Sequence, residues 1–433
     1  MASRKRKRTT TERSGFFGLL KRIGPGFITG AADDDPSGIA TYSQTGARFG
    51  YGHLWTPIFT FPLMTAVQEM CGRIGMVTGR GIAGILRARF PSTTVTLLVA
   101  LLFLANAVNI GADLGAMADA GELVFGVHGT VWLVSITAVT LALIVFVPYG
   151  TYVKYLKLLT LTLLAYVAAA FAVRQDWTLV ALSVLLPHVS LTSEYFMNVV
   201  AILGTTISPY LFFWQADEEV EEEVLDRRIE GIGEGTPRVT GAMLKRMRTD
   251  TVSGMLLSNV IMFFIILTAA STLHAHGVTD IETAADAAEA LRPLAGDVTF
   301  LVFALGILGT GLLAIPVLAG SAAYAVAEIR GWKSGLSRTA SEAKGFYAVI
   351  ALIVAVGFLV NFLGIPPFKM LYYTAVLNGI AAPPLLFVIL RIGNDRRIMG
   401  RHVNGRVSNA LGWTAFGIMT LACLAFFVTM AIS

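Results

Sequence analysis

The sequence predicts an all-α polytopic membrane protein with eleven transmembrane helices, most of them arranged as two inverted five-helix repeats. Three observations support this fold class. Of the 433 residues, 55% are hydrophobic and only 14% are charged, whereas soluble domains have about 25% charged residues. Mostly apolar stretches of about 20 residues, the length that spans a bilayer, recur along the chain. Two of them are interrupted at corresponding places, as in membrane proteins built from inverted repeats.

The predicted spans follow the apolar stretches in order. They cover 26–47, 53–77, 93–120, 129–148, 155–173, 194–217, 250–273, 297–327, 346–364, 369–391 and 409–431. Residues 1–24 form a basic tail, and residues 25–433 form a single transmembrane domain. Within this domain 26–173 is the first repeat, 194–391 is the second, and 409–431 is an extra helix.

The basic residues predict the orientation of the chain. With the N-terminus in the cytoplasm, the inner segments contain 29 of the 33 Lys and Arg residues, as the positive-inside rule requires. We therefore expect a multi-pass protein of the inner (plasma) membrane with its C-terminus outside. The basic run from Arg4 to Arg8 is then a cytoplasmic tether, and no nucleic-acid partner is expected.

The first span is a poor helix because it contains three acidic residues and a proline. Asp33, Asp34 and Asp35 precede Pro36. A carboxylate at the bilayer centre costs about 2.5–3.5 kcal/mol, so three facing lipid would cost roughly 7–10 kcal/mol. They are expected to face a cavity that attracts a cation, with the backbone opened at the proline. The alternative is an aqueous loop between two hairpins that do not span the bilayer.

The sixth span is interrupted with different chemistry. Its segment 204–210 has the sequence GTTISPY, so Pro209 lies among hydroxyl groups instead of carboxylates. The first and sixth spans each begin one five-helix half, and paired breaks of this kind indicate an ion site near the membrane midplane. The acidic run that follows, 217–223, is expected to be a solvated helix end; the alternative is an inner vestibule that draws ions out.

At these residues the chain resembles the NRAMP family of divalent-metal transporters. The likeness includes GPGF at 24–27, Asp35-Pro36 where the family has Asp-Pro-Gly-Asn, GARFGY at 46–51, RIGMVTGR at 73–80 and ADL at 112–114. The resemblance covers most of the chain and implies eleven spans in the 5+5 inverted-repeat fold of the LeuT type, with helices 1 and 6 broken.

Departures from the family pattern narrow the expected metal. The family's asparagine after the aspartate is Gly38 here, and its sixth-helix Met-Pro-His reads SPY at 208–210. Ser208 thus offers a hard oxygen in place of a soft thioether, which suits Mg²⁺ better than softer ions. The tenth-helix glutamine position is Ala375, with Asn378 nearby. This pattern is similar to the NRAMP-related magnesium transporters, which implies a larger site for a partly hydrated ion.

Other departures bear on proton coupling, which the family's main branch performs. A second family histidine is Gln215 here, and the acidic residue expected after Asp113 is Ala116. The ninth span has no arginine. Proton coupling is also dispensable, because a divalent ion that enters the cell down a membrane potential of 100 mV gains about 4.6 kcal/mol.

The predicted site joins one indispensable charge to several neutral ligands. The expected metal-site residues are Asp35, Ala32, Gly38, Thr205, Ser208 and Asn378, and the pathway candidates are Asp33, Asp34, Asp113, Tyr210, Gln215 and Glu69. The metal is a transported substrate, so we expect no cofactor. We also expect no obligate protein partner and no enzymatic activity, because no nucleophile–base pair is evident.

The main functional prediction is a transporter or facilitator that imports Mg²⁺ and/or Mn²⁺ by alternating access without proton coupling. The first alternative is a proton-coupled Mn²⁺/Fe²⁺ importer of the main NRAMP type. A more distant alternative is an amino-acid carrier of the same fold. Three aspartates disfavour it, because they would repel the substrate carboxylate that helix N-termini bind in such carriers.

Overall fold

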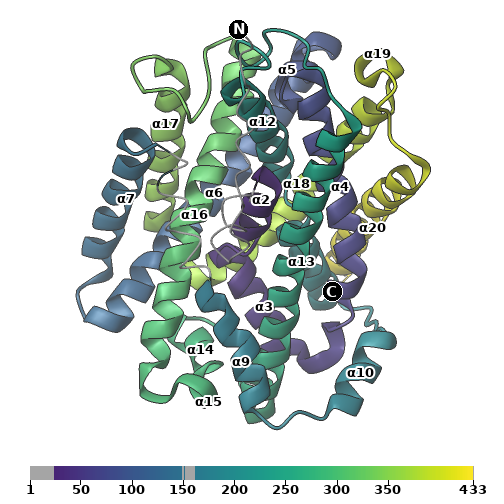
Figure 1. Ribbon diagram of the computed structural model, residues 1–433. Coiled ribbons are helices and arrows are strands. Elements are labelled where there is room, and N and C mark those ends of the chain that lie inside the picture. Colours follow the sequence, from purple (N-terminus) through teal and green to yellow (C-terminus); the bar gives the residue numbers. More distant parts are fainter. Residues whose placement is uncertain (1–23, 149–150, 152–160, 433) are drawn as a thin grey trace, which may run out of the picture.

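The computed structural model describes residues 24–148, 151 and 161–432, and this part of the chain is built from helices (Figure 1). The predicted basic tail falls almost entirely outside the described residues and stays a prediction. The same holds for the first residues of the fifth predicted span, 155–160.

The helices of the first half surround the first break. They are α2 (Pro25–Asp33), α3 (Pro36–Phe49), α4 (Thr56–Thr78), α5 (Ile82–Arg89), α6 (Ser92–Phe125), α7 (Gly129–Phe146), α9 (Leu164–Ala172) and α10 (Trp177–Leu185), with short 3₁₀ helices η1 (Gly50–His53) and η2 (Leu161–Leu163).

The second half contains the longest helices and ends in the extra helix. Its elements are α11 (Ser193–Thr206), α12 (Pro209–Leu225), α13 (Gly241–Thr272), η3 (His274–His276), α14 (Ala284–Glu289), α15 (Arg292–Ala295), η4 (Gly296–Val298), α16 (Thr299–Arg330), α17 (Lys344–Val360), η5 (Asn361–Leu363), α18 (Pro367–Asn394), α19 (Arg396–Met399) and α20 (Arg406–Ile432).

Each predicted span overlaps one helix or one interrupted pair, which confirms the helical multi-pass fold. Eight helices of the described part are long and apolar enough to cross a membrane. A ninth is added if the segments 161–172 and 177–185, bent by 118°, form one span. Length and composition alone therefore do not reach eleven. The broken first span divides into two short helices, and α4 contains Gln68, Glu69 and Arg73 within its apolar sequence.

Both expected breaks are present. α2 ends at Asp33 and α3 begins at Pro36, while α11 ends at Thr206 and α12 begins at Pro209. A proline at the first helical position loses no hydrogen bond, because that N–H has no intrahelical partner in any case. The alternative of an aqueous loop at 33–38 is wrong, since the side chains of Asp33, Asp34 and Asp35 are at most 1% exposed.

Glycines bring the broken helices close to their neighbours. A Cβ atom at Gly30 of α2 would lie 2.3 Å from the backbone of Gly254 in α13, and one at Gly204 of α11 would lie 2.0 Å from the carbonyl oxygen of Ala375 in α18. Small residues permit this near-contact of helix backbones inside a membrane. The two breaks are therefore held against α13 and α18, at the centre of the bundle (Figure 1).

Candidate functional site

Asp35 is the side chain around which the site is built. It is the N-cap of α3, where the first N–H groups lack intrahelical partners. Its Oδ1 accepts hydrogen bonds from the Ser37 hydroxyl at 2.6 Å and from the Gly38 N–H at 2.7 Å. Its Oδ2 accepts one from Asn109 Nδ2 of α6 at 3.1 Å. The carboxylate is thus fixed by the helix that it starts and points its second oxygen toward α6.

Asn109 connects Asp35 to two further predicted residues. Its Nδ2 also lies 3.2 Å from Asp113 Oδ2, and its Oδ1 accepts a hydrogen bond from Asn378 Nδ2 of α18 at 3.1 Å. Asp113 Oδ1 and the side-chain oxygen of Asn378 are buried without a hydrogen-bond partner in the described part of the chain. Buried polar atoms are normally paired, so these oxygens are available to a cation or its water.

Sequence reasoning missed Asn109, although a signal was present. It lies one helical turn before Asp113 and therefore shares its face of α6. Asp33 and Asp34 face a different helix. The Ser258 hydroxyl of α13, also missed, lies 2.5 Å from Asp33 Oδ2 and 3.1 Å from Asp34 Oδ1. The three adjacent aspartates are therefore divided between two neighbours.

The two helix breaks approach each other at Gly38. A Cβ atom at this glycine would lie 3.1 Å from the carbonyl oxygen of Asp33 and 3.3 Å from Thr205 Oγ1. The Ser208 hydroxyl does not point freely into this region, because it lies 2.7 Å from the carbonyl oxygens of both Gly204 and Thr205. Ser208 and the Thr205 carbonyl thus satisfy each other in this conformation, and a metal would have to displace that contact.

Tyr210 and Gln215 form two links from α12 to α2. The Tyr210 hydroxyl donates to the Ala32 carbonyl oxygen at 3.1 Å. Gln215 accepts a hydrogen bond from the Thr29 hydroxyl at 2.6 Å and donates one to Glu219 at 3.0 Å. This chain of polar groups runs from the first break along α12.

Gln68 of α4 lies on the face that packs against this chain. One turn further on, a Cβ atom at Gly72 would lie 3.2 Å from Gln215 Nε2. Both polar atoms of the Gln68 amide are buried without a hydrogen-bond partner among the described residues. Gln68 therefore joins the pathway candidates.

Its neighbour Glu69 does not face that path. The carboxylate of Glu69 is paired with Arg73 at 3.2 Å and with Arg248 of α13 at 3.0 Å. The structure therefore gives Glu69 an ion-pairing role, and its assignment to the pathway stays a prediction.

The acidic run is mostly buried, so the prediction of a solvated helix end is wrong. Asp217 is 0% exposed and Glu223 1% exposed. Glu221 accepts hydrogen bonds from the Leu336 and Ser337 N–H groups and from the Tyr324 hydroxyl, which fixes the loop after α16.

Glu219 opens onto a small cavity of about 50 Å³ at the end of the polar chain. The cavity lies between α2, α4, α12 and α13. Its lining combines the carboxylates of Glu219, Glu222, Asp226 and Asp250 with the guanidinium groups of Arg228 and Arg246 and with Met76, Met243 and Met247. With four carboxylates against two guanidinium groups, this arrangement favours the alternative of an inner vestibule.

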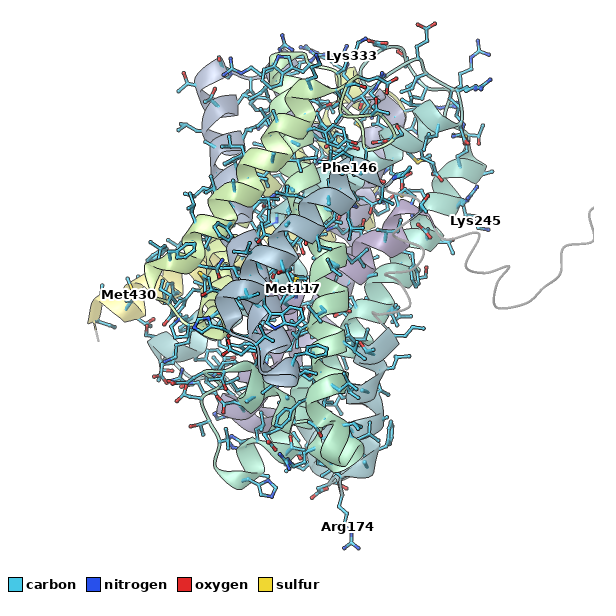
Figure 2. The ribbon with its side chains drawn as sticks, turned by 90° about the vertical axis from the view of Figure 1, so that its left-hand side faces the viewer. Met117, Phe146, Arg174, Lys245, Lys333 and Met430 are labelled. Carbon is cyan, nitrogen blue, oxygen red and sulfur yellow. The ribbon has the colours of Figure 1, made fainter. Side chains whose placement is uncertain are left out.

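A thioether also lies beside the first break. A Cβ atom at Gly311 of α16 would lie less than 3 Å from Met117 Sδ and 3.4 Å from Pro36 Cγ. Met117 is one turn after Asp113 on α6, at about mid-height of the molecule between Lys333 and Arg174 (Figure 2). Sequence reasoning missed it because the family places its methionine on the sixth helix.

Across the described ranges, no three His, Cys, Asp or Glu side chains form a group that could hold a metal ion. The polar atoms that contact Asp35 directly come from an amide, a hydroxyl and a backbone N–H, and the nearest carboxylate linked to it, that of Asp113, lies behind Asn109.

Comparison with known proteins decides the family. The family model described as "Natural resistance-associated macrophage protein-like" matches residues 26–429. The chain belongs to the NRAMP family. Among its relatives, "Divalent metal cation transporter MntH" of Ralstonia nicotianae is 27% identical over 422 residues, which are 94% of this chain and 90% of that protein. "Divalent metal cation transporter MntH 1" of Pseudomonas aeruginosa is 28% identical and covers 93% of this chain and 90% of the relative.

Solved structures share the fold of this NRAMP chain. A manganese transporter of Eremococcus coleocola superposes with a TM-score of 0.75 at 16% identity, over 95% of this chain and 86% of that one. Mhp1, a nucleobase-cation-symport-1 family transporter, superposes with a TM-score of 0.56 at 13% identity, over 94% and 93% of the two chains. The predicted fold class, an all-helical transporter of the LeuT type, is thereby confirmed.

Proposed function

We propose that this NRAMP chain carries divalent metal cations, Mn²⁺ among them, into the cell by alternating access. The observation that carries the proposal is the buried carboxylate of Asp35 at the helix break, bridged by Asn109 to Asp113 and Asn378, each of which keeps an unpaired side-chain oxygen. A buried negative charge with free oxygens close by is stabilised by a cation. The metal-site and pathway residues remain proposals that rest on this geometry.

The identity of the metal is supported by the comparisons. The relatives are divalent metal cation transporters by name, and the structural neighbour is a manganese transporter. These names favour the manganese-type importer over the uncoupled carrier of Mg²⁺ and/or Mn²⁺ that the sequence departures predicted. Met117, which like Pro36 packs against Gly311 of α16, supports the same choice, since thioethers favour softer ions.

Proton coupling is supported by the position of Asp113. It is one hydrogen-bonded residue away from Asp35, and its Oδ1 is unpaired. A proton on Asp113 or Asp35 would have to leave when a divalent ion brings two positive charges beside them. We therefore propose that this pair of carboxylates links metal entry to proton movement, in place of the two family histidines whose positions are Tyr210 and Gln215 here.

Closure at both ends supports alternating access. At one end Gln44 of α3 donates to the Thr279 carbonyl oxygen at 3.1 Å and accepts from the Ile281 N–H at 2.8 Å. At the other end Asp250 of α13 accepts hydrogen bonds from the Gly24 and Phe27 N–H groups at the start of α2, at 3.0 and 3.1 Å. A carrier would release these two sets of bonds in turn.

The proposal is tested with full-length protein in liposomes at a fixed membrane potential. Uptake of Mn²⁺ and Mg²⁺ is followed together with internal pH. We expect Mn²⁺ uptake with acidification of the lumen in step, and loss of that acidification in Asp113→Asn. Mn²⁺ uptake without acidification would favour the prediction of an uncoupled facilitator instead. No uptake of any divalent cation would overturn the proposed function.

Magnesium is a second candidate substrate, and one observation favours it. The hydroxyl of Ser208 and the amides of Asn109 and Asn378 contain hard oxygen atoms, the kind of metal ligand that suits Mg²⁺. In the same liposomes, millimolar Mg²⁺ is expected to reduce Mn²⁺ uptake. If millimolar Mg²⁺ has no effect, Mg²⁺ is excluded.

A further inference from the structure

A cavity of about 610 Å³ separate from the inner vestibule is lined mainly by basic residues. It lies between α4, α13 and the segment that leads from α19 into α20. Its lining residues are Arg73, Arg248, Arg401, His402, Val403, Gly405, Arg406, Val407 and Ser408. The transport path described above uses none of them.

The positive charge of this pocket is only partly balanced. Glu69 pairs with Arg73 and Arg248. Arg401 and Arg406 have no carboxylate partner in the part of the chain that the structure describes. Burial and the guanidinium groups of Arg401 and Arg73 also lower the pKa of His402 below its usual value. Four guanidinium groups with one carboxylate give the pocket a net positive charge, which attracts anions.

The floor of the pocket is the guanidinium group of Arg73, which its hydrogen bonds hold in place. Arg73 is only 6% exposed, and it donates to the His402 carbonyl oxygen at 2.6 Å and to Asn404 Oδ1 at 2.8 Å. The N-terminus of α20 lines the pocket from Arg406 to Ser408, and the first N–H groups of a helix attract anions. The Ser408 hydroxyl is buried with no hydrogen-bond partner in the described ranges. Guanidinium groups and free N–H donors together match the oxygens of a phosphate group.

The surroundings of the pocket are those of a lipid. Figure 1 shows α20 along the outer side of the bundle, next to α4 and α18. Val407, which lines the pocket, is 73% exposed, and Leu421 further along α20 is 67% exposed. A ligand with a phosphate head and an apolar tail can place the head on the arginines and the tail on this helix. Basic pockets of this kind between transmembrane helices bind anionic head groups.

We infer that the pocket between α4, α13 and α20 binds the phosphate group of an anionic phospholipid. The ligand is recognised by Arg401 and Arg406, by the fixed Arg73 and by the N-terminus of α20. This site is independent of the proposed metal path, since it shares no residue with it.

The test compares two double variants of the full-length protein that lose the same charge. Arg401→Gln/Arg406→Gln removes two unpaired pocket arginines, and Arg396→Gln/Arg397→Gln removes two exposed arginines of α19 that do not line the pocket. Native mass spectrometry in detergent measures binding of phosphatidylglycerol, with phosphatidylcholine as the neutral lipid. We expect the pocket variant to bind phosphatidylglycerol about thirtyfold more weakly, which corresponds to about 2 kcal/mol. The α19 variant should bind like wild type.

Two further measurements distinguish a lipid site from a soluble-anion site and from a folding defect. Mn²⁺ binding checks that each variant is folded, because it does not use the pocket. Inorganic phosphate and glycerol phosphate are titrated in a thermal-stability assay beside the lipid. If these soluble anions stabilise the protein at the same concentration as phosphatidylglycerol, the lipid assignment is overturned and a soluble phosphate is the ligand. If the two double variants bind phosphatidylglycerol equally, the pocket is not the site.

Discussion

Asp35→Asn is the substitution that tests the site most directly, because the structure separates its structural role from its charge. Asparagine is as good an N-cap as aspartate, so the hydrogen bond from the Gly38 N–H is kept. The new amide would face Asn109 Nδ2, donor to donor, in place of the present 3.1 Å hydrogen bond. Loss of one such bond costs about 1 kcal/mol, which shifts Tm by roughly 1–2 °C.

The effect on the metal should be much larger. Removal of one partner from a buried, hydrogen-bonded charge pair costs about 2–5 kcal/mol, or roughly 30-fold to 4,000-fold in affinity. We therefore expect the Kd for Mn²⁺ to rise at least about thirtyfold in calorimetric titrations of the detergent-purified protein. Uptake at subsaturating Mn²⁺ should fall in proportion.

A matched control is available at another helix. Asp176 is the N-cap of α10 and accepts hydrogen bonds from the Thr178 and Leu179 N–H groups at 3.0 and 3.1 Å. Asp176→Asn makes the same chemical change away from the break and should leave Mn²⁺ affinity unchanged. The reasoning is refuted if Asp35→Asn binds Mn²⁺ within about threefold of wild type.

Three further predictions use the same preparations. Ser208→Met adds a thioether at the second break, so Cd²⁺ and Mn²⁺ should gain over Mg²⁺ in competition uptake; an unchanged order would show that position 208 does not reach the ion. Asn109→Leu removes the link between the carboxylates, so Mn²⁺ uptake should fall about tenfold, and normal uptake would exclude Asn109 from the site. Asp250→Ala frees the Gly24 N–H at the start of α2, so a cysteine at Thr29 should react about tenfold faster with a water-soluble maleimide. An unchanged rate would exclude Asp250 as an inner latch.

Local signals in the sequence located the breaks. A proline in an apolar stretch has the same effect on a helix wherever the stretch packs, and three carboxylates cannot face lipid. Both statements hold without knowledge of the neighbours. For this reason Pro36 and Pro209 predicted the two interruptions within a residue or two.

The partners at the site depend on which helix faces which, and no local signal contains that information. Ser258 lies in an apolar helix with nothing in its sequence to mark it, yet it contacts both Asp33 and Asp34. The acidic run was misjudged for the same reason. Glu221 is buried because a loop more than 100 residues later supplies its N–H donors.

The ion pair of Glu69 could have been predicted from the sequence. Glu69 and Arg73 are four residues apart on a helix, the spacing at which opposite charges meet. This pairing alone would have weakened the assignment of Glu69 to the pathway.

The contacts among the four half-helices indicate how the breaks serve transport. α2 is joined to α12 by Tyr210 and Gln215, and α3 is joined to α11 by a hydrogen bond between Thr45 and Asn198 at 3.1 Å and by the ion pair of Arg48 with Glu194 at 2.9 Å.

The broken helices therefore form two pairs, one on each side of the site, and the two pairs meet at the breaks. A pair can tilt as a rigid body if the unwound residues absorb the change in backbone angles. The bonds within each pair would then persist in every state. The bonds of Asp250 to α2 and of Gln44 to the segment after α13 would break in turn. Asp35, at the hinge itself, would keep its ion while access passes from one side to the other.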